Sequence, residues 1–164
     1  MPVTPFHFGP GLLLKSTGLA LSMWAFMAAN VMIDVESGWH LLHHHYPVHR
    51  FCHTAVGATL LIAPATALTW VTFVVLARWL PTTLTRATFA ACLAGAALGA
   101  WTHVALDAVM HDDVRPFAPW SDANPLLDAL SLPALHQLCL ASGLLGLVII
   151  GIRTLVRRSR PAAK

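Results

Sequence analysis

Four long apolar runs constrain the fold of this chain more than any other feature. They cover residues 18–33, 54–77, 87–110 and 132–152. Each approaches the roughly 20 residues that an α-helix needs to cross about 30 Å of hydrocarbon. Because backbone polar groups in lipid must be satisfied within their own segment, such runs cross a membrane as helices. We therefore predict an all-α, polytopic membrane protein with about four transmembrane helices.

Composition agrees with this class. Hydrophobic residues make up 57% of the chain and charged residues only 10%, whereas soluble domains carry about a quarter charged residues. We predict one integral-membrane domain, 1–164, with a re-entrant or interfacial segment at 1–17 and a basic cytoplasmic tail at 153–164. That tail carries half of the ten lysines and arginines, and a basic cluster directly after an apolar run is typical of a topology signal. No nucleic-acid partner is expected.

The arginines predict the orientation. One side carries Arg78, Arg86, Arg153, Arg157, Arg158 and Arg160, whereas the opposite connections carry Arg50 and Arg115. The positive-inside rule then places the loop between the second and third runs, and the C-terminus, in the cytoplasm. The long connections at 35–53 and 111–131, with nearly all the histidines, would lie on the outer side of a bacterial inner (cytoplasmic) membrane.

The N-terminal stretch TPFHFGPGLLLKSTG, residues 4–18, leaves two topologies open. It can precede a simple first span, with His7 on the cytoplasmic side. Alternatively, Phe8 to Lys15 dips into the membrane and turns at KSTG, and the next helix rises back to Asp34. This re-entrant hairpin brings His7 toward the outer half, and such irregular backbone is tolerated only where protein or a water-filled cavity satisfies it.

The third run carries a stripe of residues spaced four apart. Its members are Ala91, Gly95, Gly99, His103, Asp107 and His111. Neighbours at this spacing share a helix face. The small residues, which include a GxxxG, let another helix approach closely, and the stripe then passes into His, Asp and His. Buried imidazole and carboxylate groups cost several kcal/mol unless they are paired, so this pattern favours a metal site over a histidine bonded to a neighbouring carbonyl.

Two other segments bring ligand types to the same outer region. In HHHYPVHRFCHT, Pro47 suits a first helical turn, and His49 and His53 are then an i, i+4 pair. The first run ends near Asp34, with Asn30 one turn below it as a residue that can support a ligand. Imidazole and carboxylate together suit Zn²⁺, with Mn²⁺ or Fe as alternatives. In a site with two ions, Asp107 is best placed to bridge.

The remaining polar residues are assigned less specific roles. Arg50 and Arg115 either grip a substrate phosphate or anchor lipid headgroups. His136 is a candidate ligand or supporting residue. The loop histidines are either solvated or capture metal; they are His40, His43, His44 and His45. Four aspartates are assigned to capping or solvation, namely Asp112, Asp113, Asp122 and Asp128. The three cysteines lack a CxxC pair and are predicted to be packing residues.

The ordered motifs TPFHFGPG, the Asp of ANVMIDVE, HRFCHT and THVALD resemble those of membrane-bound, predicted metal-dependent hydrolases of the YdjM type. The resemblance spans nearly the whole chain. The order of these motifs is also similar to that of zinc-dependent phospholipases C and related nucleases. It implies metal-site roles for His7, Asp34, His53, His103 and Asp107. The chain departs from the usual motifs at Cys52 and in the additional HHH.

The residues and the resemblance together predict a hydrolase of phosphoester bonds in lipid or lipid-linked substrates. One or two divalent ions would activate water, and Asp34 would serve as a ligand or general base. A non-catalytic metal-binding or transport protein is the main alternative, favoured by the histidine-rich loop, although Gly99, Gly95 and Ala91 offer no polar path below His103. A further alternative is a haem-binding or structural subunit of a membrane complex, but haem favours paired histidines without adjacent carboxylates.

Overall fold

The computed structural model describes residues 4–79 and 88–159, and these residues form helices and connecting segments without a strand. The elements are η1 (Thr4–His7), α1 (Phe8–Ser16), α2 (Met23–Leu42), η2 (Phe51–His53), α3 (Ala55–Leu76), α5 (Phe89–Met110) and α6 (Leu132–Ser159). The predicted all-α class is confirmed. Arg86 and Arg160, used above for the orientation, lie outside the described residues.

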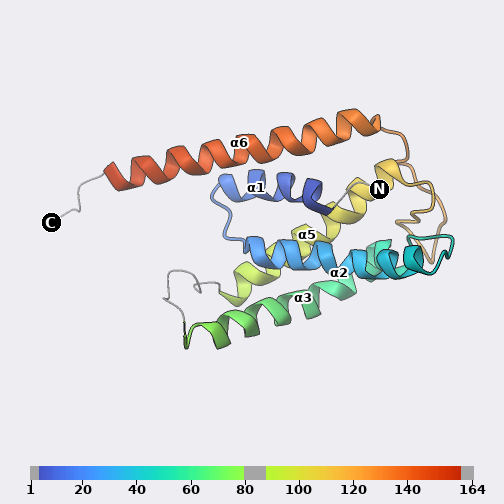
Figure 1. Ribbon diagram of the computed structural model, residues 1–164, viewed down its shortest axis with the longest axis horizontal. Helices are drawn as coiled ribbons and strands as arrows, with labels where there is room; N and C mark the ends of the chain where they lie inside the picture. The colour runs from blue at the N-terminus through green and yellow to red at the C-terminus, as the bar shows by residue number, and fades with distance from the viewer. Residues whose placement is uncertain (1–3, 80–87, 160–164) are drawn as a thin grey trace.

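The five α-helices form an elongated bundle (Figure 1). Helices α2, α3 and α5 pack against one another, and α6 packs mainly along α1 on the outside of the bundle. The connections that follow α2 and α5 gather at one end, together with η1. We call this the histidine end, and the opposite end, where α6 carries Arg153, Arg157 and Arg158, the arginine end.

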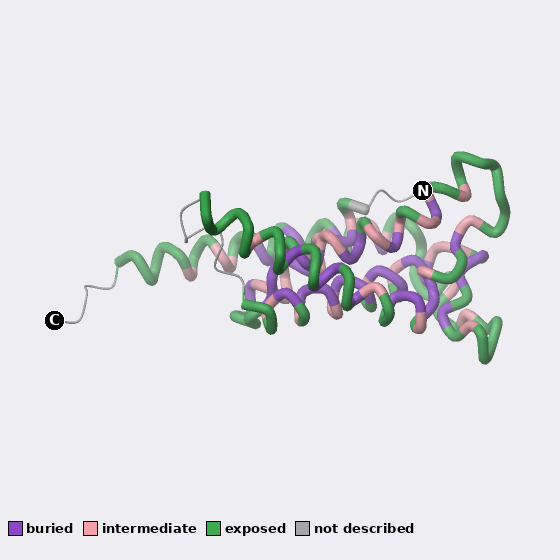
Figure 2. Tube along the Cα trace, turned by 90° about the horizontal axis from the view of Figure 1, so that it is seen from below, coloured by how far each residue is buried: buried purple, intermediate pink, exposed green. Residues whose placement is uncertain are grey.

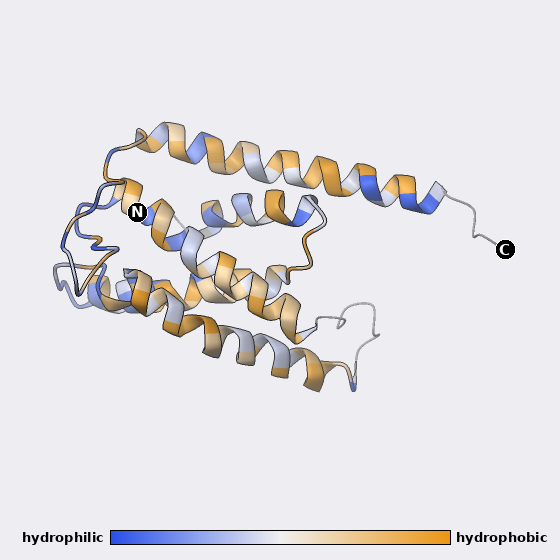
Figure 3. Ribbon diagram, turned by 180° about the vertical axis from the view of Figure 1, so that it is seen from behind, coloured by the Kyte–Doolittle hydropathy of each residue, from blue (hydrophilic) through white to orange (hydrophobic). Residues whose placement is uncertain are grey.

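Three of the described helices are long and apolar enough to cross a membrane: α3, α5 and α6. Their outward faces are apolar, with exposed leucines and valines along α3 and α6 (Figure 3). The first of the four expected spans, residues 18–33, is not among them. It does not begin a helix until Met23, and α2 then continues through Asp34, Glu36 and His40, which make its second half polar. The structure thus indicates an integral membrane protein with three candidate spans.

The close helix approach predicted from the small residues of α5 is confirmed. A Cβ atom on Gly95 would overlap the carbonyl of Ser22, and one on Gly99 would overlap the backbone of Phe26. The N-terminal half of α2 therefore lies directly against α5, and the buried residues concentrate where these helices meet (Figure 2). One turn beyond Gly99 on the same face comes His103, so this contact fixes α2 against the ligands of α5.

The N-terminal segment forms a helical hairpin rather than a simple first span. Helix α1 ends at Ser16, the chain turns back, and Ser22 caps α2 by accepting a hydrogen bond from the backbone N–H of Ala25. A Cβ on Gly9 would overlap the Cys139 carbonyl, and Gly146 lies against the backbone of α1. These glycines let α1 dock tightly on α6, which holds η1 and its His7 at the histidine end.

Candidate metal centre

Four side chains from three segments converge beneath the histidine end. Asp34 lies in the second half of α2, His53 ends η2, and His103 and Asp107 lie one turn apart on α5. One ligand atom from each lies within 4.8 Å of the others, a spacing that can hold a metal ion. We call these four residues the first group. His53, His103 and Asp107 are buried, whereas the Asp34 side chain is 29% exposed.

The distances within the first group link each imidazole to both carboxylates. His103 Nε2 lies 3.2 Å from Asp34 Oδ1 and 3.3 Å from Asp107 Oδ2. His53 Nε2 lies 3.7 Å and 3.2 Å from the same two oxygens. His7 belongs to neither metal-capable group of the described residues but borders the first, with Nε2 3.2 Å from Asp107 Oδ1. The hairpin thus brings His7 to the carboxylate at the centre of the cluster.

Several polar atoms of this cluster have no hydrogen-bond partner, although they are buried. These are both ring nitrogens of His7, both of His53, Nε2 of His103 and Oδ1 of Asp107. A buried polar atom left unsatisfied costs about 1–3 kcal/mol. The Nε2 atoms of His7, His53 and His103 lie 3.2–3.3 Å from Asp107 oxygens, so this arrangement is favourable only when a proton or a cation is shared between them. A bound cation would satisfy several of them at once.

The tautomer of His103 follows from its other nitrogen. Asn30 Nδ2 donates to the carbonyls of Phe26 and Gly99, at 2.8 Å and 3.3 Å, so the amide oxygen must face the ring. His103 Nδ1 lies 3.0 Å from that oxygen and must therefore be the donor. The neutral ring then directs the Nε2 lone pair at Asp34 and Asp107, an arrangement that is repulsive unless a cation or proton lies between them. Asn30 thus has the supporting position predicted from the sequence.

His53 is placed by the short turn in front of α3. Thr54 caps α3 by accepting from the Gly57 N–H at 2.9 Å, and a Cβ on Gly57 would overlap the Phe51 carbonyl. Glu36 reaches across from α2 and accepts the Cys52 N–H at 2.7 Å. Burial and the Glu36 carboxylate raise the pKa of Cys52 to about 11, so this thiol stays neutral and is a poor metal ligand.

A second metal-capable group shares Asp107 with the first. It consists of His49, Asp107 and His111. The His49 ring stacks on His111 with centroids 4.2 Å apart and meets His53 edge-on at 4.6 Å. Burial and the neighbouring His49 lower the pKa of His111, which favours the neutral ring that a metal ligand requires. Asp107 is therefore the point where the two groups meet.

Asp113 supports the second group, a role that the sequence analysis missed. Its Oδ1 lies 2.7 Å from His49 Nδ1, and its Oδ2 accepts the backbone N–H groups of Val48 and His49. Burial opposes its ionisation, but these hydrogen bonds prevail, and the pKa of Asp113 lies below its usual value. A carboxylate on Nδ1 leaves Nε2 of His49 for a ligand, an arrangement common behind metal-binding histidines. In the sequence, the only signal was an aspartate two residues after His111.

The donor set and its spacing fit a transition-metal ion. Four donors placed tetrahedrally at about 2.0–2.1 Å from Zn²⁺ lie about 3.3–3.4 Å from one another. The four nitrogen-to-oxygen distances of the first group run from 3.2 to 3.7 Å. Two imidazoles and two carboxylates suit Zn²⁺, Mn²⁺ or Fe²⁺. Asp34, His53, His103 and Asp107 would hold such an ion, and His49, His111 and Asp107 a second one.

Two local expectations, on Asp34 and on the His49–His53 pair, were wrong. Asp34 does not mark a helix end, since α2 continues for two further turns to Leu42. His49 and His53 are not an i, i+4 helical pair, because Pro47 precedes a bent segment and α3 begins only at Ala55. His111 lies one residue past α5, as its C-cap, although its N–H still donates to the Asp107 carbonyl at 2.9 Å.

The other polar residues lie around the cluster rather than in it. Arg50 and Arg115 line a cavity that opens beside His49 and Asp113. His136 belongs to neither metal-capable group, and its ring stacks on Phe6 at 4.5 Å. The loop histidines at residues 40 and 43–45 also lie outside both groups, at the end of α2 and in the following turn.

Comparison of the chain with protein-family models, with curated proteins and with solved structures finds no match. The resemblance to YdjM-type hydrolases therefore stays a prediction. What the described residues show is a buried His/Asp cluster able to hold a metal and three helices long and apolar enough to cross a membrane.

Proposed function

We propose that this chain is a membrane-embedded, metal-dependent hydrolase that cleaves phosphoester bonds of lipid or lipid-linked substrates. The observation that carries the proposal is the convergence of three buried imidazole Nε2 atoms on the Asp107 carboxylate, with a second metal-capable group on the same residue. A divalent cation bound there would acidify a water molecule and stabilise negative charge on a phosphoryl oxygen.

The two carboxylates of the first group differ in access, which suggests different roles. The Asp107 side chain is only 4% exposed and lies between the two groups, a position suited to holding ligands together. The Asp34 side chain is 29% exposed on the edge of the cluster, where water and substrate can reach it. Asp34 is thus the better candidate for the general base that accepts a proton from the attacking water.

A cavity of about 510 Å³ beside the second group offers a place for the substrate. Its polar lining includes His49, Asp113, Arg50 and Arg115, and Phe51 contributes an apolar wall. Arg50 Nε donates to the Pro47 carbonyl, and Arg115 Nη1 to those of Asp112 and Val114, so each guanidinium is held by its own loop. Their remaining N–H groups suit phosphate oxygens, and the mixed lining suits a headgroup.

The interior beneath the cluster argues against metal transport. Between His103 and the arginine end, the interior of the bundle is an apolar core that includes Ala29, Ala58 and Ala96. Thr66 and Thr69 are buried on α3, but each hydroxyl donates to a carbonyl of its own helix. A transport path needs polar groups along its length. The apolar core among the described residues therefore favours a catalytic site over a transport path.

The central test is metal content together with turnover. Purified without chelator, the wild type should contain stoichiometric divalent metal and release phosphate-containing headgroups from phospholipid or polyprenyl-phosphate substrates. Asp107→Asn keeps the size but removes the shared charge, so it should lose metal and reduce turnover by more than the roughly 10–100-fold typical of supporting residues. Asp112→Asn, exposed on the neighbouring turn, is the matched control.

Metal-free wild-type protein would refute the site. Metal retained with unchanged hydrolysis in Asp107→Asn would show a structural ion, and the enzyme proposal would be dropped. Circular dichroism and size-exclusion profiles of both variants would establish that folding is preserved.

We further propose that the histidine end faces outward and the arginine end the cytoplasm. The described arginines of α6, together with Arg78 after α3, lie at one end, as the positive-inside rule requires for a cytoplasmic face. Single cysteines introduced at His44 and Ser159, in a background without native cysteines, should be labelled by an impermeant reagent from opposite sides. Labelling of both from the same side would contradict the topology.

A further inference from the structure

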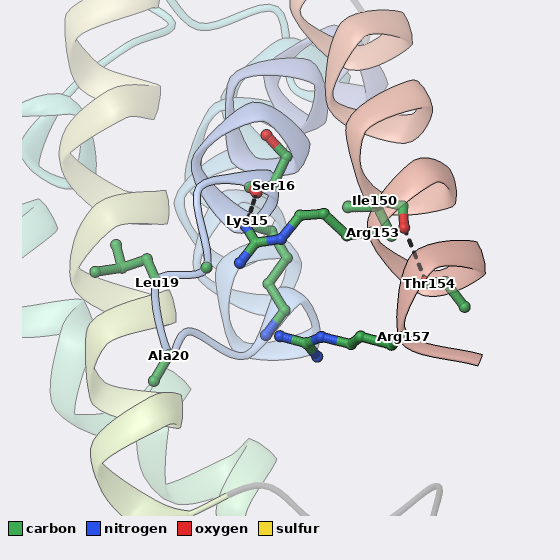
Figure 4. Close-up of a pocket in the computed structure, with 9 residues that line it drawn as sticks. Lys15, Ser16, Leu19, Ala20, Ile150, Arg153, Thr154 and Arg157 are labelled. Atoms are coloured by element: carbon green, nitrogen blue, oxygen red, sulfur yellow. Dashed lines mark hydrogen bonds between the residues drawn. The ribbon is translucent and has the colours of Figure 1, made fainter. Parts of the chain in front are cut away.

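A basic cavity, whose lining is drawn in Figure 4, lies at the arginine end of the bundle. It has a volume of about 260 Å³ and is lined by the end of α1, the α1–α2 turn and the last turns of α6. Three cationic side chains reach it: Lys15 from α1, and Arg153 and Arg157 from α6. Nothing in the proposed hydrolase chemistry uses this cavity.

Two of the three cations are held in place by the backbone of the turn. Arg153 Nη1 donates to the Ser16 carbonyl, and Lys15 Nζ donates to the Leu21 carbonyl at 2.6 Å. Gly18 has a positive φ of 96°, and a Cβ there would lie 2.8 Å from Nη2 of Arg153. The absence of a side chain at Gly18 thus leaves room for the Arg153 guanidinium against the turn. Each cation keeps further N–H groups that have no acceptor among the described residues.

Among the described residues, the positive charge at this end has no acidic side chain as a counterion. All seven acidic residues of the chain fall between positions 34 and 128, and every ion pair of the described residues lies at the histidine end. No carboxylate is among the described residues that line the cavity. Three cations around one small cavity repel one another, so an anion in the cavity would be strongly favoured.

We propose that this cavity binds a phosphate group, carried by an anionic phospholipid headgroup or present as free phosphate. Guanidinium groups match pairs of phosphate oxygens, and an ammonium adds a compact charge. The cavity lies where the apolar part of α6 gives way to its arginines, which is headgroup depth for a spanning helix. Leu19 and Ile150 line its rim and would contact the first carbons of a lipid.

The test compares two neighbouring arginines. Arg157 lines the cavity and makes no hydrogen bond to the described residues, whereas Arg158 is the next residue and does not line it. In nanodiscs of mixed zwitterionic and anionic phospholipids, native mass spectrometry should find one anionic lipid retained by the full-length wild type. Arg157→Gln should weaken retention about tenfold, and Arg158→Gln less than about twofold.

A second arm distinguishes the source of the phosphate. Isothermal titration of detergent-purified protein with inorganic phosphate should show no saturable binding if the ligand is a lipid headgroup. Saturable binding that Arg157→Gln weakens and Arg158→Gln spares, without selective lipid retention, would support the site and assign it to free phosphate. Equal behaviour of the two variants in both arms overturns the proposal. Because this site does not involve the His/Asp cluster, its failure leaves the hydrolase proposal untouched.

Discussion

The two metal-capable groups share Asp107 but are supported in different ways. In the first, His103 is on a helix, and its Nδ1 is held by the neutral amide of Asn30 in the buried interior. In the second, His49 and His111 lie on segments outside the helices, and His49 is held by the charged Asp113. Near the apolar core, a neutral supporting group avoids the cost of another buried charge, whereas near the rim a carboxylate is tolerated.

This difference suggests that the two groups bind metal unequally. The first has donors fixed by packing between α2, α3 and α5, so little ordering is needed when an ion binds. The second depends on a connecting segment whose position rests on the Asp113 hydrogen bonds. We expect a tight site at the first group and a weaker one at the second, and variants of the two supporting residues can test this.

Among variants of the supporting residues, the largest effect is expected for Asn30→Ala. Without the amide oxygen, the His103 ring is free to change tautomer or rotate, so affinity at the first group should fall about 10–100-fold. The second group should be unaffected. Competitive titration against a chromophoric chelator would resolve the two affinities. Ser37→Ala, which removes a buried hydroxyl of α2 that bonds the Asp34 carbonyl, is the control. Equal weakening of both ions by Asn30→Ala would contradict separate support of the two groups.

A smaller effect, confined to the second group, is expected for Asp113→Asn. The amide keeps the size but loses the charge that holds His49 Nδ1, so the weaker ion should bind about tenfold more weakly. Affinity at the first group should stay within about twofold, as measured by the same titration. Asp112→Asn changes the same charge on the adjacent, exposed residue and should leave both affinities unchanged. An effect confined to the tight site would reverse the assignment of the supporting residues.

The sequence predicted the part of the site that lies on regular helices. The four-residue spacing of Gly95, Gly99, His103 and Asp107 specifies both a close contact and a polar patch, because α-helical geometry fixes which side chains share a face. Asn30, one turn below Asp34, was found for the same reason. The hairpin was one of two topologies left open for residues 4–18, and it was indicated by the Gly and Pro residues, the KSTG turn and the length of the segment rather than by periodicity.

The parts on irregular segments were not predicted. The pairing of Asp113 with His49 joins residues 64 positions apart through a bend that has no periodicity. Pro47 indicated a helix start, yet only the short 3-10 helix η2 forms before Thr54 caps α3, so the predicted i, i+4 pairing of His49 and His53 was wrong. The extension of α2 past Asp34 was missed because tertiary contacts, such as the hydrogen bond from the Cys52 N–H to Glu36, stabilise its polar second half.

The smallest effect is expected for the histidine-rich turn. His43, His44 and His45 are exposed, and His43 Nδ1 and His45 Nδ1 contact the Trp39 carbonyl and His40 rather than the cluster. Replacing the four histidines at 40 and 43–45 by serine should therefore leave the amount of tightly bound metal and the rate of turnover within about twofold of the wild type. Substitutions at a distance from a site rarely perturb it. Metal analysis and initial rates at saturating metal would measure both quantities. A slower approach to full loading at limiting metal, with the same end point, would mean that the turn captures ions for the site. A lower end point would make the turn a ligand and remove the distinction between buried groups and exposed loop on which the comparison rests.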